Sequence, residues 1–326
     1  MTRYNVVIPA DFPPLVSASP HLEELRQVAE YQLYTDRPQE ASEVIHRLRN
    51  ADILLNSRGS LAFPEDILKQ LPRLKMIAVC GIGFDSIHLP TATAQGIVVC
   101  NVPGRTASIV AEHALAMMLS TARRITWMNN SLQQGNWSGE LSIPLTGKRL
   151  GVVGTGNIGC RMLQLCRAIG MKTSAWSLNP DPQKAAQLQF DYVDLETLLR
   201  ESDVVSLHTR LSAKTHHLIN AQRIALMKPT AILVNTSRGA VVCTKDLLDA
   251  LHNGRLFGAA LDVFEQEPLA ADDPVRSCPR VVLTPHSADT TQEAIDLLTT
   301  GCIANITAFL RGEPRNVVNP DVLNRP

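Results

Sequence analysis

Short hydrophobic runs alternate with amphipathic stretches along the whole chain. The runs are rich in β-branched residues and mostly lack polar–apolar alternation, which is typical of parallel strands covered on both faces. They predict strands at 5–9, 53–56, 76–80, 98–100, 150–153, 173–176, 204–207, 232–235, 258–261 and 281–283. Helical periodicity predicts helices at 21–34, 108–124, 157–169, 244–253 and 290–310. This alternation predicts an α/β fold with doubly wound parallel sheets.

Length and composition narrow the class of protein. The 326 residues are enough for two domains at roughly 100–200 residues each. Thirty-one basic residues balance thirty-one acidic ones and only 4% of residues are aromatic, so we expect no nucleic-acid partner. Apolar runs are shorter than the ~20 residues that span a bilayer, and the first residues lack a signal-peptide pattern. We therefore expect no membrane partner and a cytoplasmic location.

Cysteine and histidine spacing gives no sign of a disulfide framework or a metal. The seven cysteines contain no Cys-x-x-Cys and the nine histidines no His-Glu-x-x-His. We expect buried free thiols and no metal site.

The strongest local signal is the run GTGNIG at 154–159, which follows a predicted strand and opens a predicted helix. In such a run Gly154 permits a tight turn, Gly156 lets a pyrophosphate approach the backbone, and Gly159 lets helix and strand pack closely. The start of the helix adds amide donors and a positive dipole. The sequence therefore predicts a dinucleotide cofactor here.

The residues after the next strand do not decide between NAD and NADP. An NAD site usually has an acid at the end of that strand, where it binds the ribose hydroxyls. Ser177 occupies this position, so nothing there repels the 2′-phosphate of NADP. Arg210 is either a partner for that phosphate or a solvated loop residue, and Asp181 is an alternative ribose ligand. NAD and NADP both remain possible.

Three later segments place charged side chains just past successive strands. They carry Arg238, the acids of 262–267 and His286. Residues beyond the carboxyl ends of parallel strands converge on the crevice where such sheets bind ligands. Reduction of a ketone puts negative charge on its oxygen, so a proton donor is needed there, and a carboxylate beside a histidine stabilises the imidazolium. Each residue taken singly also has a structural interpretation. Arg238 could form a structural salt bridge, Glu267 could be a surface turn residue, and His286 could be a buried histidine with its hydrogen bonds satisfied.

These segments, together with VCGIGFDSI at 79–87 and VAEHAL at 110–115, resemble the D-isomer-specific 2-hydroxyacid dehydrogenase family. The similarity covers nearly the whole chain, with several motifs in the family's order. The resemblance implies that Arg238, Glu267 and His286 are the catalytic trio.

The resemblance also implies where the ligands bind. The backbone amides of Gly81, Ile82 and Gly83 are expected to hold the substrate carboxylate. Besides the fingerprint glycines, the resemblance implies that the cofactor is bordered by Asn157, Ile158, Thr236, Arg238, Asp262 and His286. We also expect Ser177, Ser237 and Asp289 at the cofactor, although Ser177 replaces the family's usual acid and Asp289 stands where many members have glycine.

The family's architecture implies two domains that the chain crosses twice. Residues 1–100 and 285–326 are expected to form a flavodoxin-like substrate domain, and 101–284 an inserted Rossmann domain. A cleft between them is expected to close over cofactor and substrate. A homodimer is expected from the resemblance alone.

We therefore expect an NAD(P)-dependent enzyme that interconverts a small 2-oxo acid and its D-2-hydroxy acid. The alternative is an NAD(H)-binding regulatory protein similar to corepressors of the C-terminal-binding-protein type, which share the trio. A formate dehydrogenase is disfavoured, because formate oxidation needs no proton acceptor and Glu267 would have no task. Which 2-oxo acid is used stays open, with Arg58 either a partner for a second anionic group or a solvated residue.

Overall fold

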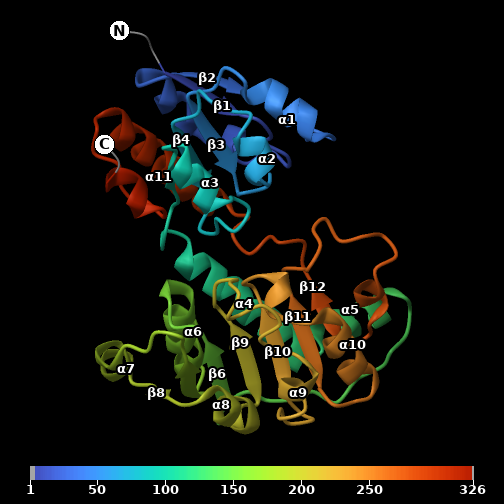
Figure 1. The fold of residues 1–326 in the computed structure, drawn as a ribbon. Coiled ribbons are helices and arrows are strands. Elements are labelled where there is room, and N and C mark those ends of the chain that lie inside the picture. Colours follow the sequence, from blue (N-terminus) through green and yellow to red (C-terminus); the bar gives the residue numbers. More distant parts are fainter. Residues whose placement is uncertain (1–3, 325–326) are drawn as a thin grey trace. The chain divides into compact units, whose positions relative to one another are not determined.

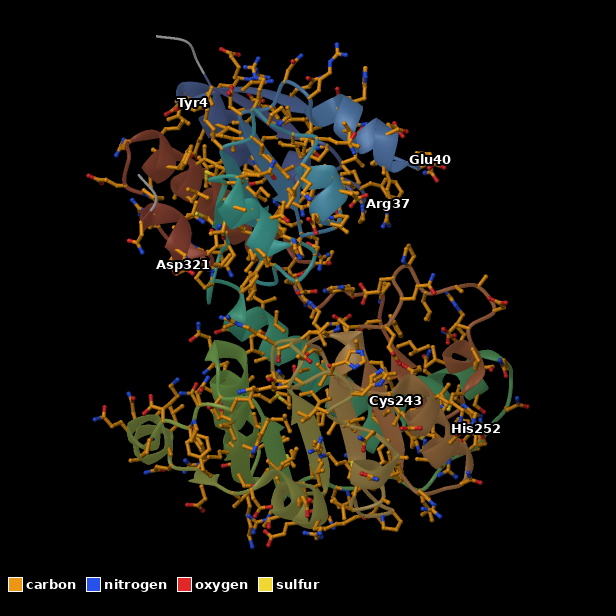
Figure 2. All side chains as sticks on the ribbon, in the orientation of Figure 1. Tyr4, Arg37, Glu40, Cys243, His252 and Asp321 are labelled. Carbon is orange, nitrogen blue, oxygen red and sulfur yellow. The ribbon has the colours of Figure 1, made fainter. Side chains whose placement is uncertain are left out.

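The computed structural model describes residues 4–324 and divides into two compact units. Unit 1 comprises Met1–Thr106 and Thr290–Pro326, and unit 2 comprises Ala107–Asp289. Tyr4 and Asp321, near the two ends of the chain, both belong to unit 1 (Figure 2).

Unit 1 is built on a five-stranded parallel sheet with the order β2-β1-β3-β4-β5 (Figure 1). Its strands are β1 (Asn5–Ile8), β2 (Glu30–Leu33), β3 (Ile53–Ser57), β4 (Met76–Cys80) and β5 (Val98–Cys100). The 2-1-3-4-5 order is that of flavodoxin-like folds. Every residue of β3, β4 and β5 is buried, which explains their uninterrupted hydrophobic runs.

The predicted helix at 21–34 is wrong in its second half. A 3₁₀ helix spans Pro20–Gln27, and the chain then enters β2, Glu30–Leu33. Leu22 and Leu25 are buried at helical spacing, which produced the helical pattern. β2 lies at the sheet edge and alternates exposed with half-buried residues, so its four residues carry little hydrophobic signal. Pairing with β1 overrides the local pattern.

Helices cover both faces of the sheet of unit 1. They are α1 (Ala41–Leu48), α2 (Glu65–Leu68), α3 (Leu89–Ala94) and α11 (Gln292–Leu310). By length and composition alone α11 is apolar enough to cross a membrane. Its residues Leu298, Cys302 and Ile306 are buried in the core of unit 1, which is typical of a core helix.

Unit 2 is built on a seven-stranded parallel sheet with the order β12-β11-β10-β9-β6-β7-β8. Its strands are β6 (Arg149–Val153), β7 (Lys172–Trp176), β8 (Asp191–Tyr192), β9 (Val204–Leu207), β10 (Ile232–Asn235), β11 (Gly258–Leu261) and β12 (Val281–Leu283). Counted from β6, this is the 3-2-1-4-5-6 order of the Rossmann fold with one further strand. The edge strand β8 was not predicted, because two residues give no pattern.

Successive residues of the central strands enter different cores. Val204 and Ile232 belong to the cluster formed with α4 (Ala107–Ala122) and α6 (Asn157–Ala168). Their neighbours Val205 and Leu233 belong to the cluster on the opposite face. Both faces are covered by helices (Figure 1), so the prediction of doubly wound sheets is confirmed. The other helices of unit 2 are α5 (Ile125–Gln133), α7 (Pro182–Leu188), α8 (Leu195–Glu201), α9 (Ala221–Ile224) and α10 (Thr244–His252), whose N-cap Cys243 and last residue His252 are labelled in Figure 2.

The chain crosses between the units a few residues later than the predicted boundaries at 100 and 284. After β5, the amide of Val102 donates to the carbonyl of Gly81 at 2.8 Å, which keeps this segment in unit 1 until α4 begins. At the second crossing, the amides of Ser287 and Ala288 bind the carboxylate of Asp262 and hold this loop in unit 2.

Candidate active site

Three neighbouring strands of unit 2 bring the predicted catalytic residues to one edge of the sheet. Asn235 at the end of β10 pairs with Leu261 at the end of β11, and Leu261 pairs with Leu283 of β12. The loops that follow carry Arg238, Glu267 and His286, one from each strand. Because the strands are parallel and in register, these loops leave the sheet on the same side.

His286 and Glu267 form a close pair. Nδ1 of His286 lies 2.6 Å from Oε2 of Glu267, and Oε1 accepts from the amide of Phe264 at 2.9 Å. The two side chains are 39% and 34% exposed, so a solute can reach them. Burial alone would raise the pKa of the Glu267 carboxyl, but its hydrogen bonds and the charges of His286 and Arg238 hold that pKa below its ordinary value. Glu267 therefore stays ionised beside the imidazole.

Arg238 reaches the same site through the contact between two loops. A Cβ on Gly239 would lie 1.9 Å from the carbonyl carbon of Phe264, so the loop that carries Arg238 packs directly on the loop that carries Glu267. Asn235 Nδ2 donates to the carbonyl of Arg238 at 2.9 Å and fixes the turn. The paired strand ends and this loop contact therefore bring the segments of all three predicted residues together, and the charge of Arg238 contributes to the lowered pKa of Glu267.

The carboxylate of Asp262 is fully buried and holds the His286 loop. It accepts from Thr284 Oγ1 at 2.6 Å and from the amides of Ser287 and Ala288 at 2.8 and 3.1 Å. The amide of His286 donates to the carbonyl of Asp262 at 2.7 Å, and His286 takes a left-handed φ of 50°. Burial alone would raise the pKa of Asp262, but these bonds and His113 hold it below its ordinary value. Asp262 was predicted to border the cofactor, and both of its carboxylate oxygens bind the His286 loop.

The side chains that support Asp262 from behind were not predicted from the sequence. His113 of α4 lies 3.1 Å from Thr284 Oγ1 and 3.6 Å from Asp262 Oδ1. Thr284 gives its one hydroxyl proton to Asp262, so it accepts from His113. Only the VAEHAL motif pointed to this histidine, and Thr284 carried no signal.

Glu265 was also missed as a support of the Glu267 loop. Its carboxylate accepts from the amide of Thr244 at 2.8 Å and lies 2.9 Å from His217 Nε2. Burial alone would raise the pKa of Glu265, but these bonds lower it. The sequence offered Glu265 only as one of several acids after β11.

The glycine fingerprint has the geometry that a pyrophosphate needs. Gly154 has a φ of +101°, and a Cβ there would lie 2.6 Å from the carbonyl oxygen of His208. A Cβ on Gly159 would lie 1.9 Å from the carbonyl oxygen of Gly154. A Cβ on Gly156 would meet no atom within 4 Å, so the space before α6 is open. Asn157 and Ile158 are the first two residues of α6.

Two buried polar atoms near this loop also fit a bound dinucleotide. Thr236 Oγ1 and His208 Nδ1 are buried and have no hydrogen-bond partner within residues 4–324. Burial lowers the pKa of His208 to about 4, so its ring is neutral at pH 7. Both residues follow adjacent strands, β10 and β9, at the fingerprint edge. A bound dinucleotide supplies polar atoms at this edge, so the residues present fit NAD or NADP.

The remaining predicted cofactor residues lie in the loops of this edge. Ser177 follows β7, and its hydroxyl and the backbone of Asn179 bond each other at 3.3 Å. Ser237 Oγ donates to Asn235 Oδ1 at 2.8 Å. Asp289 is the last residue of unit 2.

The predicted carboxylate-binding loop belongs to unit 1. It follows β4, the carbonyl of Gly81 accepts from the amide of Val102 at 2.8 Å, and that of Ile82 accepts from Asn101 Nδ2 at 2.6 Å. Gly83 faces Gly59, whose Cβ position is 3.6 Å from the carbonyl oxygen of Gly83. These bonds use carbonyl oxygens and none of the three amides.

Comparison with known proteins gives the same picture. Residues 115–288 match the family described as D-isomer specific 2-hydroxyacid dehydrogenase, NAD binding domain. A glyoxylate reductase of Thermococcus litoralis is 40% identical over 269 residues, 79% of this chain and 81% of the relative. D-lactate dehydrogenase of Aquifex aeolicus, solved with NAD and lactic acid, has a TM-score of 0.83 at 31% identity, over 95% of this chain and 96% of that one.

A third relative carries the other coenzyme. An acyclic imino acid reductase solved with NADPH and D-Arg has a TM-score of 0.87 at 26% identity, over 96% of this chain and 99% of that one. The coenzyme therefore varies among structures that share this fold. With its fold, its fingerprint and these relatives, the chain belongs to the D-isomer-specific 2-hydroxyacid dehydrogenase family and is an NAD(P)-dependent oxidoreductase of 2-hydroxy acids.

Proposed function

We propose that Arg238, Glu267 and His286 catalyse the reversible reduction of a small 2-oxo acid to its D-2-hydroxy acid. The observation that carries this proposal is the 2.6 Å contact between His286 and Glu267 at the sheet edge that also holds Arg238 and the glycine fingerprint. The reduced nicotinamide, when bound, supplies the hydride.

His286 is the general acid of the reduction. Its Nδ1 faces the ionised carboxylate of Glu267, so Nδ1 carries a proton and Nε2 is the nitrogen that exchanges one with the substrate. As the carbonyl carbon receives the hydride, its oxygen becomes negative and takes the proton from Nε2. In the oxidation of the alcohol, the neutral Nε2 accepts that proton back.

Arg238 binds and polarises the substrate. Its planar guanidinium offers several donors to a carboxylate or a carbonyl oxygen. The positive charge also stabilises the oxygen as negative charge develops on it. The amides of Gly81, Ile82 and Gly83 are proposed to hold the substrate carboxylate, on the strength of the resemblance.

Glyoxylate is the first substrate to test, because several relatives are named glyoxylate reductases. The experiment is a spectrophotometric screen of glyoxylate, hydroxypyruvate, pyruvate, phenylpyruvate and phosphohydroxypyruvate, each with NADH and with NADPH. We expect substrate-dependent oxidation of at least one coenzyme at a rate typical of enzymes, on the order of 1–10³ per second. Tight coenzyme binding with no turnover on any of these acids would favour the NAD(H)-binding regulatory protein instead.

We further propose that two copies of the chain associate through the α5 surface, defined as α5 and the segment up to Leu141. No residue of α5 is buried. Among residues 4–324, eight large hydrophobic side chains are exposed, and four of them lie here: Ile125, Leu132, Trp137 and Leu141. Trp137 and Leu141 are 95% and 94% exposed. Apolar patches of this kind mark interfaces, and the twofold homodimer is the commonest soluble oligomer.

A further inference from the structure

We propose that the enzyme prefers NADPH, and that Lys184 and Ser177 form the site that takes its 2′-phosphate. This inference rests on the proposed function only in that the coenzyme binds at the glycine fingerprint. It concerns the segment 177–190 of unit 2, which follows β7 and includes α7; in this segment Lys184 is the only cation and Asp181 the only acid.

Ser177 lies directly beside the fingerprint turn. Val153 of β6 pairs with Trp176 of β7, and the amide of Gly154 donates to the carbonyl of Trp176 at 2.7 Å. The next residue, Ser177, therefore stands at the ribose end of the dinucleotide site. Its hydroxyl both donates and accepts, so it can bind a phosphate oxygen, whereas a carboxylate at this position would repel it.

The one acid of this segment is engaged as a helix cap. Oδ1 of Asp181 accepts from the amides of Gln183 and Lys184 at 3.0 and 3.1 Å, which makes Asp181 the N-cap of α7. Its own amide donates to the hydroxyl of Tyr192 at 3.2 Å. In the proposed site Asp181 therefore caps α7 and does not act as the missing ribose-binding acid.

Lys184 instead brings a positive charge to the fingerprint. Its Nζ donates to the carbonyl of Thr155, the second residue of the fingerprint, at 3.3 Å. The hydroxyls of Thr155 and Tyr192 share a hydrogen bond at 2.7 Å, so α7, β8 and the fingerprint meet at one residue. An ammonium group has three donors, and one bond to Thr155 leaves others for a phosphate.

The charge of Lys184 is also felt at the first turn of α6. Burial raises the pKa of the Cys160 thiol, the charge of Lys184 opposes this rise, and the weaker effect of the Asp181 charge adds to it. Cys160 Sγ donates to the same Thr155 carbonyl at 3.3 Å. Ser177, with its hydroxyl, and the ammonium group of Lys184 thus both lie beside the fingerprint turn, in the segment that follows β7. A 2′-phosphate dianion gains charge-assisted bonds here, whereas the free hydroxyl of NADH gains none of them.

The test measures binding rather than turnover. The full-length enzyme is titrated with NADPH, NADH, 2′,5′-ADP and 5′-AMP, using quenching of tryptophan fluorescence or calorimetry. We expect NADPH to bind at least ~10-fold more tightly than NADH, the effect of one or more charge-assisted bonds. The same preference is expected for 2′,5′-ADP over 5′-AMP, since these probes lack the nicotinamide.

Variants then assign the preference to residues. Lys184→Gln should weaken NADPH and 2′,5′-ADP by ~10-fold and NADH by less than about twofold. Ser177→Asp should reverse the preference. The control is Lys172→Gln, an exposed lysine at the other end of β7, which should change neither affinity. Unchanged melting temperatures show that the variants fold.

Several outcomes would overturn the inference. Tighter binding of NADH by the parent enzyme would do so, and so would an equal loss of both coenzymes in Lys184→Gln. Loss of the NADPH preference in Arg210→Gln but not in Lys184→Gln would move the phosphate site to the loop after β9. Failure of all four probes to bind would contradict the proposed function itself, not only the coenzyme preference.

Discussion

At His286, the contact with Glu267 determines which ring nitrogen exchanges a proton with the substrate in the proposed reaction. The left-handed backbone at His286 is held by Asp262, so the imidazole is presented by a loop that the protein fixes from behind. The two carboxylates therefore act differently, Glu267 on the protonation of the ring and Asp262 on the stability of the loop.

Glu267→Gln should lower kcat/KM for reduction at least ~10-fold. In the parent enzyme the ionised carboxylate lies 2.6 Å from Nδ1 of His286, and a neutral amide removes this charge-assisted bond. The pKa of Glu267 lies below its ordinary value of 4.5, so its contribution is present above that value and is lost as pH falls through the lowered pKa, a loss that the variant cannot show. The measurement is kcat/KM for reduction across pH 4–9, and profiles of equal height and shape for the two enzymes would argue against the pair.

Asp262→Asn should make stability less sensitive to acid. The pKa of Asp262 in the folded protein lies below its ordinary value of 3.8, so its stabilising contribution is present above that value and is lost as pH falls through the folded pKa. The variant should lose about 2 kcal/mol near neutrality, because a buried amide cannot satisfy all of these donors.

Urea unfolding at several pH values checks this prediction. The stability of the parent protein should fall more steeply below about pH 4 than that of Asp262→Asn, by the linkage of protonation to folding. Parallel curves for the two proteins would show that Asp262 does not titrate in this way.

At the scale of elements, the loops after β10 and β11 depend on each other through Gly239. Gly239→Ala would place a methyl group 1.9 Å from the backbone of Phe264 and push the two loops apart. We expect kcat to fall at least ~10-fold and the melting temperature to drop, since backbone cannot yield cheaply to this contact. Gly139→Ala is the control for the added methyl group, because a Cβ there meets no atom of its own chain within 4 Å, and it should keep the kcat of the parent. Since Gly139 lies on the α5 surface, the two proteins are compared at the same molecular mass in solution.

The elements that could be predicted are those with a pattern of their own. The buried strands β3, β4, β9 and β10 begin and end within a residue of the predicted bounds. Both faces of these strands are buried, so their residues form continuous hydrophobic runs that are easily recognised in the sequence. The edge strands β2 and β8 were missed, because one face of each is polar and each is short.

The site shows the same division. Arg238, Glu267 and His286 could be placed together because each follows a predicted strand of one parallel sheet. Their supports could not be found, since Thr284, His113 and Glu265 act across contacts that join distant parts of the sequence. Lys184 could not be predicted either, because its hydrogen bond to Thr155 depends on how α7 packs against the fingerprint.

At the scale of the whole molecule, the α5 surface predicts the oligomeric state. Trp137→Ser combined with Leu141→Ser should convert a dimer to a monomer, because both side chains are almost fully exposed in a single chain. Light scattering after size-exclusion chromatography measures the mass. Leu323→Ser, a 50% exposed leucine in unit 1, is the control and should leave the mass unchanged. A parent protein that is monomeric at micromolar concentration would remove the basis for this interface.

The most direct test of the account is the turnover of His286→Asn. Asparagine tolerates the left-handed backbone that His286 adopts, so the loop can keep its shape while the acid is lost. With the preferred 2-oxo acid and saturating coenzyme, kcat should fall by ~10²–10⁴, the usual contribution of a positioned general acid. Coenzyme affinity, measured by fluorescence, should stay within about twofold of the parent. Turnover equal to that of the parent enzyme would remove His286 from the reaction and contradict the account.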